Sequence, residues 1–136
     1  DLWQLPVMME LNAGAIRFAR RYRMPGTIVS YEDAILYDMI FRTSSPTGSL
    51  EIFVSEKVQK IRQWDQTNST DYYKTLCTYL RCNFHRTETA QQLYIHKTTL
   101  SYRLLRMSQQ FGIDWESYDE RLKLMMSVFL LEHFLD

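Results

Sequence analysis

The spacing of apolar residues predicts a helical structure for most of the chain after residue 49. Apolar side chains recur there at steps of three and four residues, which is the period of amphipathic helices. Polar residues between the stripes predict turns, one of them at residues 65–70. The expected helices cover residues 50–64, 72–83, 87–93, 97–111 and 118 onward. The last helix is expected to bury Leu122, Met125, Met126, Phe129, Leu130 and Phe134.

Residues 1–49 have a more mixed pattern. A helix over 11–23 should end at Pro25-Gly26, and the β-branched stretch 27–31 predicts a single strand. A second helix is expected over 34–41, followed by a Ser- and Thr-rich linker. The predicted fold class is therefore mainly α, a helix-turn-helix bundle with a small α/β remnant at the N-terminus.

Local signals define the ends of the later helices. Gly112 follows the 97–111 helix where a left-handed C-terminal cap is expected, and Ser117 with Glu120 has the spacing of a capping box. His96 precedes the 97–111 helix, so it can cap that helix or touch a phosphate. Both roles stay open at this stage.

The helices over 87–93 and 97–111 are separated by so few residues that they cannot pack side by side. A large angle between them is expected, with the small Ala90 allowing close approach, and this is the geometry of a helix-turn-helix pair. Many such pairs have Gly at the turn position that Tyr94 occupies here.

The 97–111 helix has two different faces when its residues are placed about 100° apart. Leu100, Leu104, Met107 and Phe111 form one edge, which we expect to be buried. The opposite side carries hydroxyl, amide and aromatic groups with cationic flanks, and such a face can enter a DNA major groove. Its members are Thr98, Ser101, Tyr102, Leu105, Arg106 and Gln109.

The distribution of charge strengthens this hypothesis, although the whole chain has a formal net charge of zero. Residues 71–111 hold six basic and two acidic side chains, a net charge of +4. Residues 112–136 hold two basic and six acidic side chains, a net charge of −4. Positive charge is thus concentrated on the segment with the helix pair, as expected for a surface that meets nucleic acid.

We therefore expect the 97–111 helix to be a recognition helix that contacts double-stranded DNA. Tyr102 and Arg103 could equally pack against the preceding helix, and that alternative stays open. The candidate DNA-binding residues are Arg86, Thr87, His96, Lys97, Thr98, Ser101, Tyr102, Arg103 and Arg106.

The same segment resembles the C-terminal domain of the PucR/CdaR family of bacterial transcription regulators, over roughly residues 70–132. The family more often has Arg-Asn at the positions of Lys97-Thr98, so its base preference does not transfer to this chain. The resembling residues are Thr75-Leu76, Tyr79-Leu80, Asn83, Thr89-Ala90, Leu93, the run from Ile95 to Leu104, Gly112, Asp114, Arg121-Leu122 and Leu124.

The resemblance implies a sequence-specific transcription regulator with two regions. Residues 1–48 would be the tail of a GGDEF-like regulatory domain plus a linker, and residues 49–136 the helix-turn-helix domain. Because the chain opens at Asp1, we expect a fragment whose missing upstream domain binds any small-molecule effector. A homodimer is expected, since one helix-turn-helix unit rarely makes enough DNA contacts.

Other chemistries have less support in the sequence. Cys77, Cys82 and His85 do not have the paired spacing of a structural zinc site, so reduced thiols and no metal are expected. A GG(D/E)EF signature is absent, and we expect neither catalysis nor a cofactor. No apolar run approaches the roughly 18 residues of a membrane span, so a cytoplasmic protein without a membrane partner is expected. The neutral net charge leaves one alternative, a protein-interaction module that keeps the fold without binding DNA.

Overall fold

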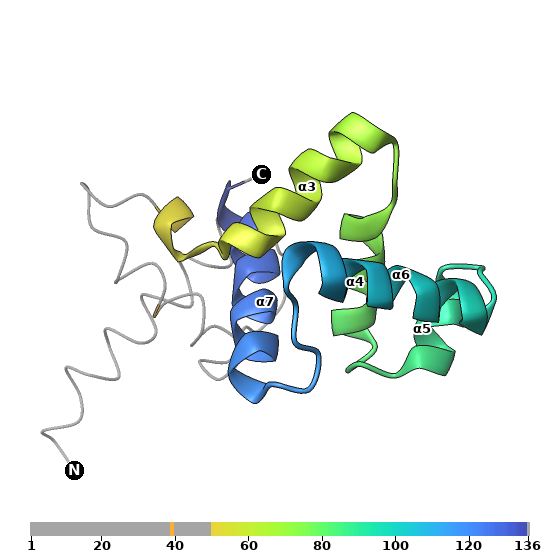
Figure 1. Cartoon of the computed structure of the whole chain (residues 1–136). Coiled ribbons are helices and arrows are strands. Elements are labelled where there is room, and N and C mark those ends of the chain that lie inside the picture. Colours follow the sequence, from red (N-terminus) through yellow and green to blue (C-terminus); the bar gives the residue numbers. More distant parts are fainter. Residues whose placement is uncertain (1–38, 40–49, 136) are drawn as a thin grey trace, which may run out of the picture. The chain divides into compact units, whose positions relative to one another are not determined.

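The computed structural model describes Met39 and residues 50–135 (Figure 1). Five α-helices follow one another in this part of the chain, between a short 3-10 helix and a final π-helical turn. No strand occurs among the described residues. The elements are η2 (Leu50–Phe53), α3 (Glu56–Asn68), α4 (Tyr72–Arg81), α5 (Arg86–Gln92), α6 (Lys97–Phe111), α7 (Tyr118–Leu130) and η3 (Leu131–Leu135).

The predicted helical bundle is confirmed for this part of the chain. The α/β remnant and the elements expected over 11–23, 27–31 and 34–41 lie outside the described residues, except that Met39 is helical.

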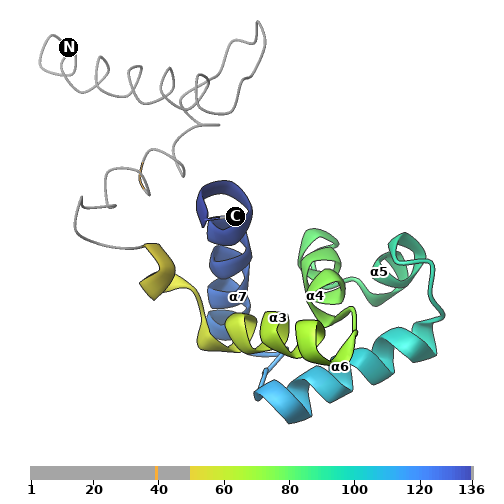
Figure 2. The same cartoon turned by 90° about the horizontal axis from the view of Figure 1, so that it is seen from above.

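One edge of α6 forms the centre of the core. Leu100, Leu104 and Met107 are at most 2% exposed, and Phe111 closes the same edge. Helices α3, α4 and α5 all pack against α6 (Figure 2). The buried edge predicted from the period of this helix is therefore confirmed.

The expected helix over 50–64 is wrong at both ends. The chain first forms the short η2, and α3 begins only after Ser55, whose hydroxyl accepts a hydrogen bond from the backbone N–H of Lys57 at 3.3 Å. The backbone N–H of Ser55 itself donates to Ser127 Oγ on α7 at 2.8 Å. This contact with a distant helix sets the start of α3, and the break leaves Ile52 and Phe53 exposed.

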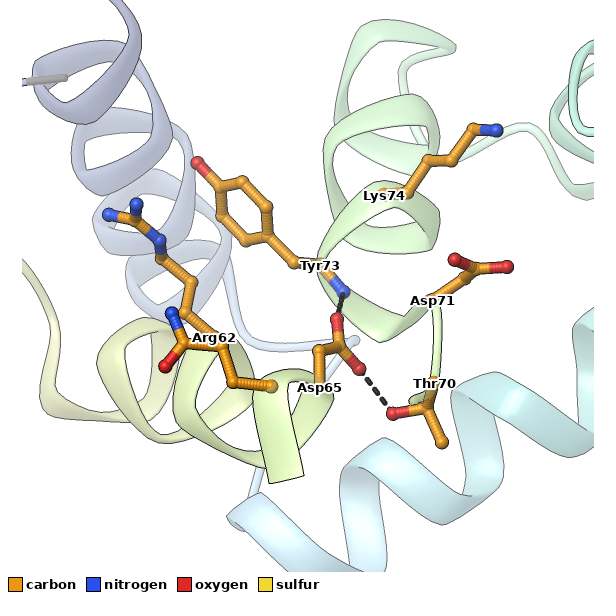
Figure 3. Close-up of a pocket in the computed structure, with 7 residues that line it drawn as sticks. Arg62, Asp65, Thr70, Asp71, Tyr73 and Lys74 are labelled. Carbon is orange, nitrogen blue, oxygen red and sulfur yellow. Dashed lines mark hydrogen bonds between the residues drawn. The ribbon is translucent and has the colours of Figure 1, made fainter. Parts of the chain in front are cut away.

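The turn expected at 65–70 is also wrong, because α3 continues to Asn68 and ends at Ser69 in a left-handed conformation. Asp65 stays in the helix and turns its carboxylate to the start of α4. It accepts hydrogen bonds from the backbone N–H of Tyr73 at 2.7 Å and from the Thr70 hydroxyl (Figure 3). It also accepts one from the backbone N–H of Tyr72 at 3.0 Å. A residue in one helix therefore caps the next one.

The buried face of α7 differs from the expected one. Leu122 and Met125 are 47% and 43% exposed, whereas Leu124, Ser127 and Val128 are buried. Polar contacts with α3 fix this rotation: Ser127 binds the Ser55 N–H, and Glu120 pairs with Lys57 at 2.5 Å. The apolar stripe alone could not reveal it, since apolar residues surround most of this helix. Of the other expected core residues, Leu130 is buried, while Met126, Phe129 and Phe134 are half-buried.

The predicted glycine cap after α6 is present, but only half of the predicted capping box is. The Ser117 N–H donates to Asp114 O, and the Glu120 carboxylate pairs with Lys57 instead. Gly112 has a φ of 67° and its N–H donates to Ser108 O, so α6 ends in a left-handed cap. Ser117 Oγ accepts from the Glu120 N–H at 3.3 Å, which caps α7. Together they set the turn that brings α7 back toward α3.

Replacing Asp65 with Ala should lower the free energy of unfolding by about 1–3 kcal/mol, because two N–H groups of α4 lose their acceptor. Urea denaturation followed by circular dichroism measures this. Asp71→Ala is the matched control, since Asp71 stands at the N-cap position of α4 without a side-chain capping bond. Equal losses for the two variants would contradict the capping role of Asp65.

Candidate nucleic-acid interface

Helices α5 and α6 are joined by a four-residue turn, and the first three of its backbone N–H groups are hydrogen-bonded. The N–H groups of Leu93, Tyr94 and Ile95 donate to carbonyls of α5 at 3.0–3.1 Å. Ala90, 2% exposed, lies inside the junction, as the small residue predicted there should. The turn is thus rigid, and it fixes the direction in which α6 leaves α5.

Tyr94 occupies the turn position where many helix-turn-helix proteins have glycine. Its φ is 54°, in the left-handed region that glycine adopts without strain, and its side chain is 96% exposed. The ring therefore packs against little of the protein, and its contacts do little to offset the free-energy cost of the left-handed backbone.

The outward side of α6 carries the side chains that the period of the helix placed there. Thr98, Ser101 and Arg106 are exposed, and Tyr102 and Leu105 are 59% and 55% exposed. Gln109 extends the same face toward the C-terminus and is exposed as well. The helix thus has one buried apolar edge and one open, mostly polar face.

Cationic side chains flank this open face. Lys97 and Arg106 on α6 are exposed, and so are Arg86 and Thr87 at the start of α5. At about 100° per residue, Lys97 and Arg106 lie on opposite sides of Thr98 around α6, so positive charge borders the face on both sides.

Arg103 lies away from this face. Its guanidinium donates to Thr75 Oγ1 on α4 at 2.9 Å and lies 4.0 Å from Asp71, with 23% of the side chain exposed. Thr75 is fully buried and its hydroxyl donates in turn to the Asp71 carbonyl at 2.7 Å. The geometry favours the packing alternative for Arg103, which ties α6 to α4.

His96 caps α6. Its Nδ1 accepts a hydrogen bond from the backbone N–H of Thr98 at 3.3 Å and lies 2.9 Å from Thr98 Oγ1. The capping alternative is therefore confirmed, and it positions the Thr98 hydroxyl at the first turn of the helix.

Two other features, a pocket and a pair of cysteines, are less suited to binding or catalysis. A shallow pocket of about 280 Å³ lies between α3 and α4, but the Asp65 carboxylate in its wall is committed to capping α4 (Figure 3). Cys77 and Cys82 are buried free thiols, and burial raises the pKa of the Cys77 thiol, which disfavours the reactive thiolate. Within the described residues, no group of three or more His, Cys, Asp or Glu side chains could hold a metal ion.

Comparison with known proteins agrees with this geometry. Residues 72–129, from the start of α4 to near the end of α7, match the family model of the PucR C-terminal helix-turn-helix domain. This part of the chain is a PucR-type helix-turn-helix domain. The family predicted from the run Ile95–Leu104 and the residues around it is thus confirmed for the C-terminal region.

Two curated relatives of the PucR-type domain are transcription regulators. The proline-responsive transcriptional activator PutR of Bacillus subtilis is 34% identical over 68 residues, which cover 50% of this chain and 16% of that protein. The carbohydrate diacid regulator of Escherichia coli is 39% identical over 59 residues, which cover 43% of this chain and 15% of that protein. The chain thus spans about one sixth of each relative's length.

No solved structure matches the chain. Among the described helices of the PucR-type domain and its flanks, none is long and apolar enough to cross a membrane.

Tyr94→Gly should raise the free energy of unfolding of the PucR-type domain by roughly 0.5–1 kcal/mol, because relief of the left-handed strain exceeds the added entropy of the unfolded chain. Thermal denaturation measures the change. Tyr94→Ala removes the ring but keeps the strain, so it should leave stability nearly unchanged. A glycine variant less stable than the alanine variant would contradict the strain argument.

His96→Ala should destabilise the domain by about 1 kcal/mol, since the Thr98 N–H loses its acceptor, while His96→Asn should retain parental stability because Asn is a good N-cap. Chemical denaturation provides the measurement. His85→Ala serves as the control, because His85 stands at the N-cap of α5 without a side-chain capping bond. Similar losses from the two alanine variants would show that His96 does not act as a cap.

Proposed function

We propose that the chain belongs to a bacterial transcription regulator and binds double-stranded DNA sequence-specifically, with α6 in the major groove. One observation carries this proposal: α6 buries its Leu100–Phe111 edge and leaves Thr98, Ser101 and Tyr102 open. A groove about 12 Å wide admits an α-helix whose outward face carries short polar groups.

The proposed contacts divide into two classes. Thr98, Ser101 and Tyr102 face base edges, because hydroxyl groups can both donate and accept hydrogen bonds there. Lys97 and Arg106 lie beside them and neutralise phosphates, which strengthens binding to any sequence.

The start of α5 supplies a second set of contacts. Arg86 and Thr87 are exposed in the first turn of α5 and would contact the phosphate backbone that borders the same groove. Arg103 and His96 take positioning roles, since their side chains are engaged with Thr75 and Thr98.

The charge of the chain supports one orientation on DNA. Residues 71–111, from the N-cap of α4 to the end of α6, have a net charge of +4, and the segment from Gly112 onward has a net charge of −4. Asp114, Asp119 and Glu120 surround the start of α7, so repulsion from phosphates disfavours docking through that end.

The number of base contacts that one recognition helix can make bears on the oligomeric state. One recognition helix makes few base contacts, so we propose a homodimer that reads two half-sites. Residues 1–48 would belong to a GGDEF-like regulatory region and residues 49–136 to the DNA-binding region. An upstream part would bind any effector, and the regulator would work in the cytoplasm without catalysis or a cofactor.

Removing two phosphate contacts by Lys97→Ala with Arg106→Ala should weaken binding to selected and random duplexes alike. The slope of log affinity against log salt should fall in magnitude by about two, at roughly 0.9 per phosphate contact. Fluorescence anisotropy across a salt series measures both quantities. In the same titrations, Thr98→Ala and Ser101→Ala should change the preferred sequence and leave the slope unchanged.

The control is Lys60→Ala with Lys123→Ala, which removes the same charge from exposed positions on α3 and α7. An unchanged affinity and slope in the Lys97/Arg106 variant would exclude the proposed docking face. Absence of salt-dependent binding by the normally folded parental chain would instead favour a module without DNA binding.

A further inference from the structure

Leu105 interrupts the polar outward face of α6 with an apolar side chain. It is 55% exposed, whereas its neighbour Leu104 is 2% exposed and belongs to the core. At about 100° and 1.5 Å per residue, Leu105 lies within about 20° of Thr98 around the helix and about 10 Å further along it. It therefore shares the proposed base-reading face and extends it toward the middle of α6.

The surroundings of Leu105 are polar and cationic. Ser101 lies one turn before it and Gln109 one turn after it, and both are exposed. Tyr102, three residues earlier, is 59% exposed, so its ring and the leucine form a short apolar strip on this face. The exposed Arg106 follows directly and borders the strip with positive charge.

This combination restricts what the leucine can meet in a major groove. Adenine, guanine and cytosine present only hydrogen-bonding groups on that edge, whereas thymine also presents its C5-methyl group. An aliphatic side chain forms no hydrogen bonds. The thymine methyl group is therefore the one feature of the major-groove edge whose contact with such a side chain removes apolar surface from water.

We propose that Leu105 is a specificity-determining residue that selects thymine through contact with its C5-methyl group. This inference rests on the proposed function, since it requires α6 to lie in the major groove. The selected thymine lies within about three base pairs of the position that Thr98 reads, given the 3.4 Å rise per base pair and the spacing of about 10 Å along α6.

Replacement of thymine by deoxyuridine removes the methyl group and leaves the hydrogen-bonding edge unchanged, so it isolates the proposed contact. The whole 136-residue chain is first used to enrich duplexes from a random pool, and each thymine of the enriched site is then replaced in turn. At one thymine in each half-site, replacement by deoxyuridine should weaken DNA binding by the parental chain about three- to fivefold. This is the loss in affinity expected for one buried methyl group.

Leu105→Ala should bind the thymine and deoxyuridine duplexes with equal affinity at that position, and Leu105→Met should keep most of the discrimination. Leu122→Ala is the matched control, because Leu122 is an exposed leucine on α7 at 47%. It should show the parental penalty for deoxyuridine. Thermal denaturation confirms folding, which truncation at this exposed position should leave intact.

The outcomes separate the inference from the proposed function. If the parent enriches no sequence and its weak binding to random duplex does not depend on salt, the proposed function fails, and the inference with it. If the parent enriches a site but Leu105→Ala keeps the full deoxyuridine penalty, only the inference is overturned. It is also overturned if Leu105→Ala disrupts a dimer of the free chain and leaves discrimination unchanged.

Discussion

The burial of one edge of α6 is the interaction on which the rest of the described structure depends. Leu100, Leu104, Met107 and Phe111 occupy the space between α3, α4 and α5, and burying each such side chain contributes about 1.5–3 kcal/mol. Because these residues repeat with the helical period, their burial fixes the rotation of α6 about its axis. The outward direction of Thr98, Ser101 and Tyr102 follows from that rotation.

Several polar side chains, among them Arg103 that the sequence offered as a DNA contact, hold helices at fixed angles. Arg103 ties α6 to α4 through Thr75, and Lys57 ties α3 to the turn after α6 through the Gly112 carbonyl at 2.6 Å. Asp65 orders the start of α4 from within α3. In the described unit, some charged side chains therefore maintain the angles between helices. Others stay exposed on the α5–α6 pair.

The parts of the fold that could be predicted depend on local signals. The bounds of α6 follow from its apolar period, from His96 before it and from Gly112 after it, and the structure agrees with all three. The start of α3 and the rotation of α7 could not be predicted, because both depend on the hydrogen bond between Ser55 and Ser127, 72 residues apart. The outward face of α6 was also predictable, whereas the inward turn of Arg103 was not, since it depends on a hydroxyl 28 residues away.

The link between Ser55 and Ser127 also bears on which length of chain is the smallest folding unit. The match to the family model begins at residue 72, yet Val58 and Ile61 of α3 are fully buried and this helix packs on α6. A piece cut to residues 72–129 would uncover the part of the leucine edge of α6 that α3 covers, and Ser127 would lose its hydrogen-bond partner Ser55. We therefore expect the folding unit to be longer than the segment that the family model matches, because α3 lies before that segment and packs on both α6 and α7.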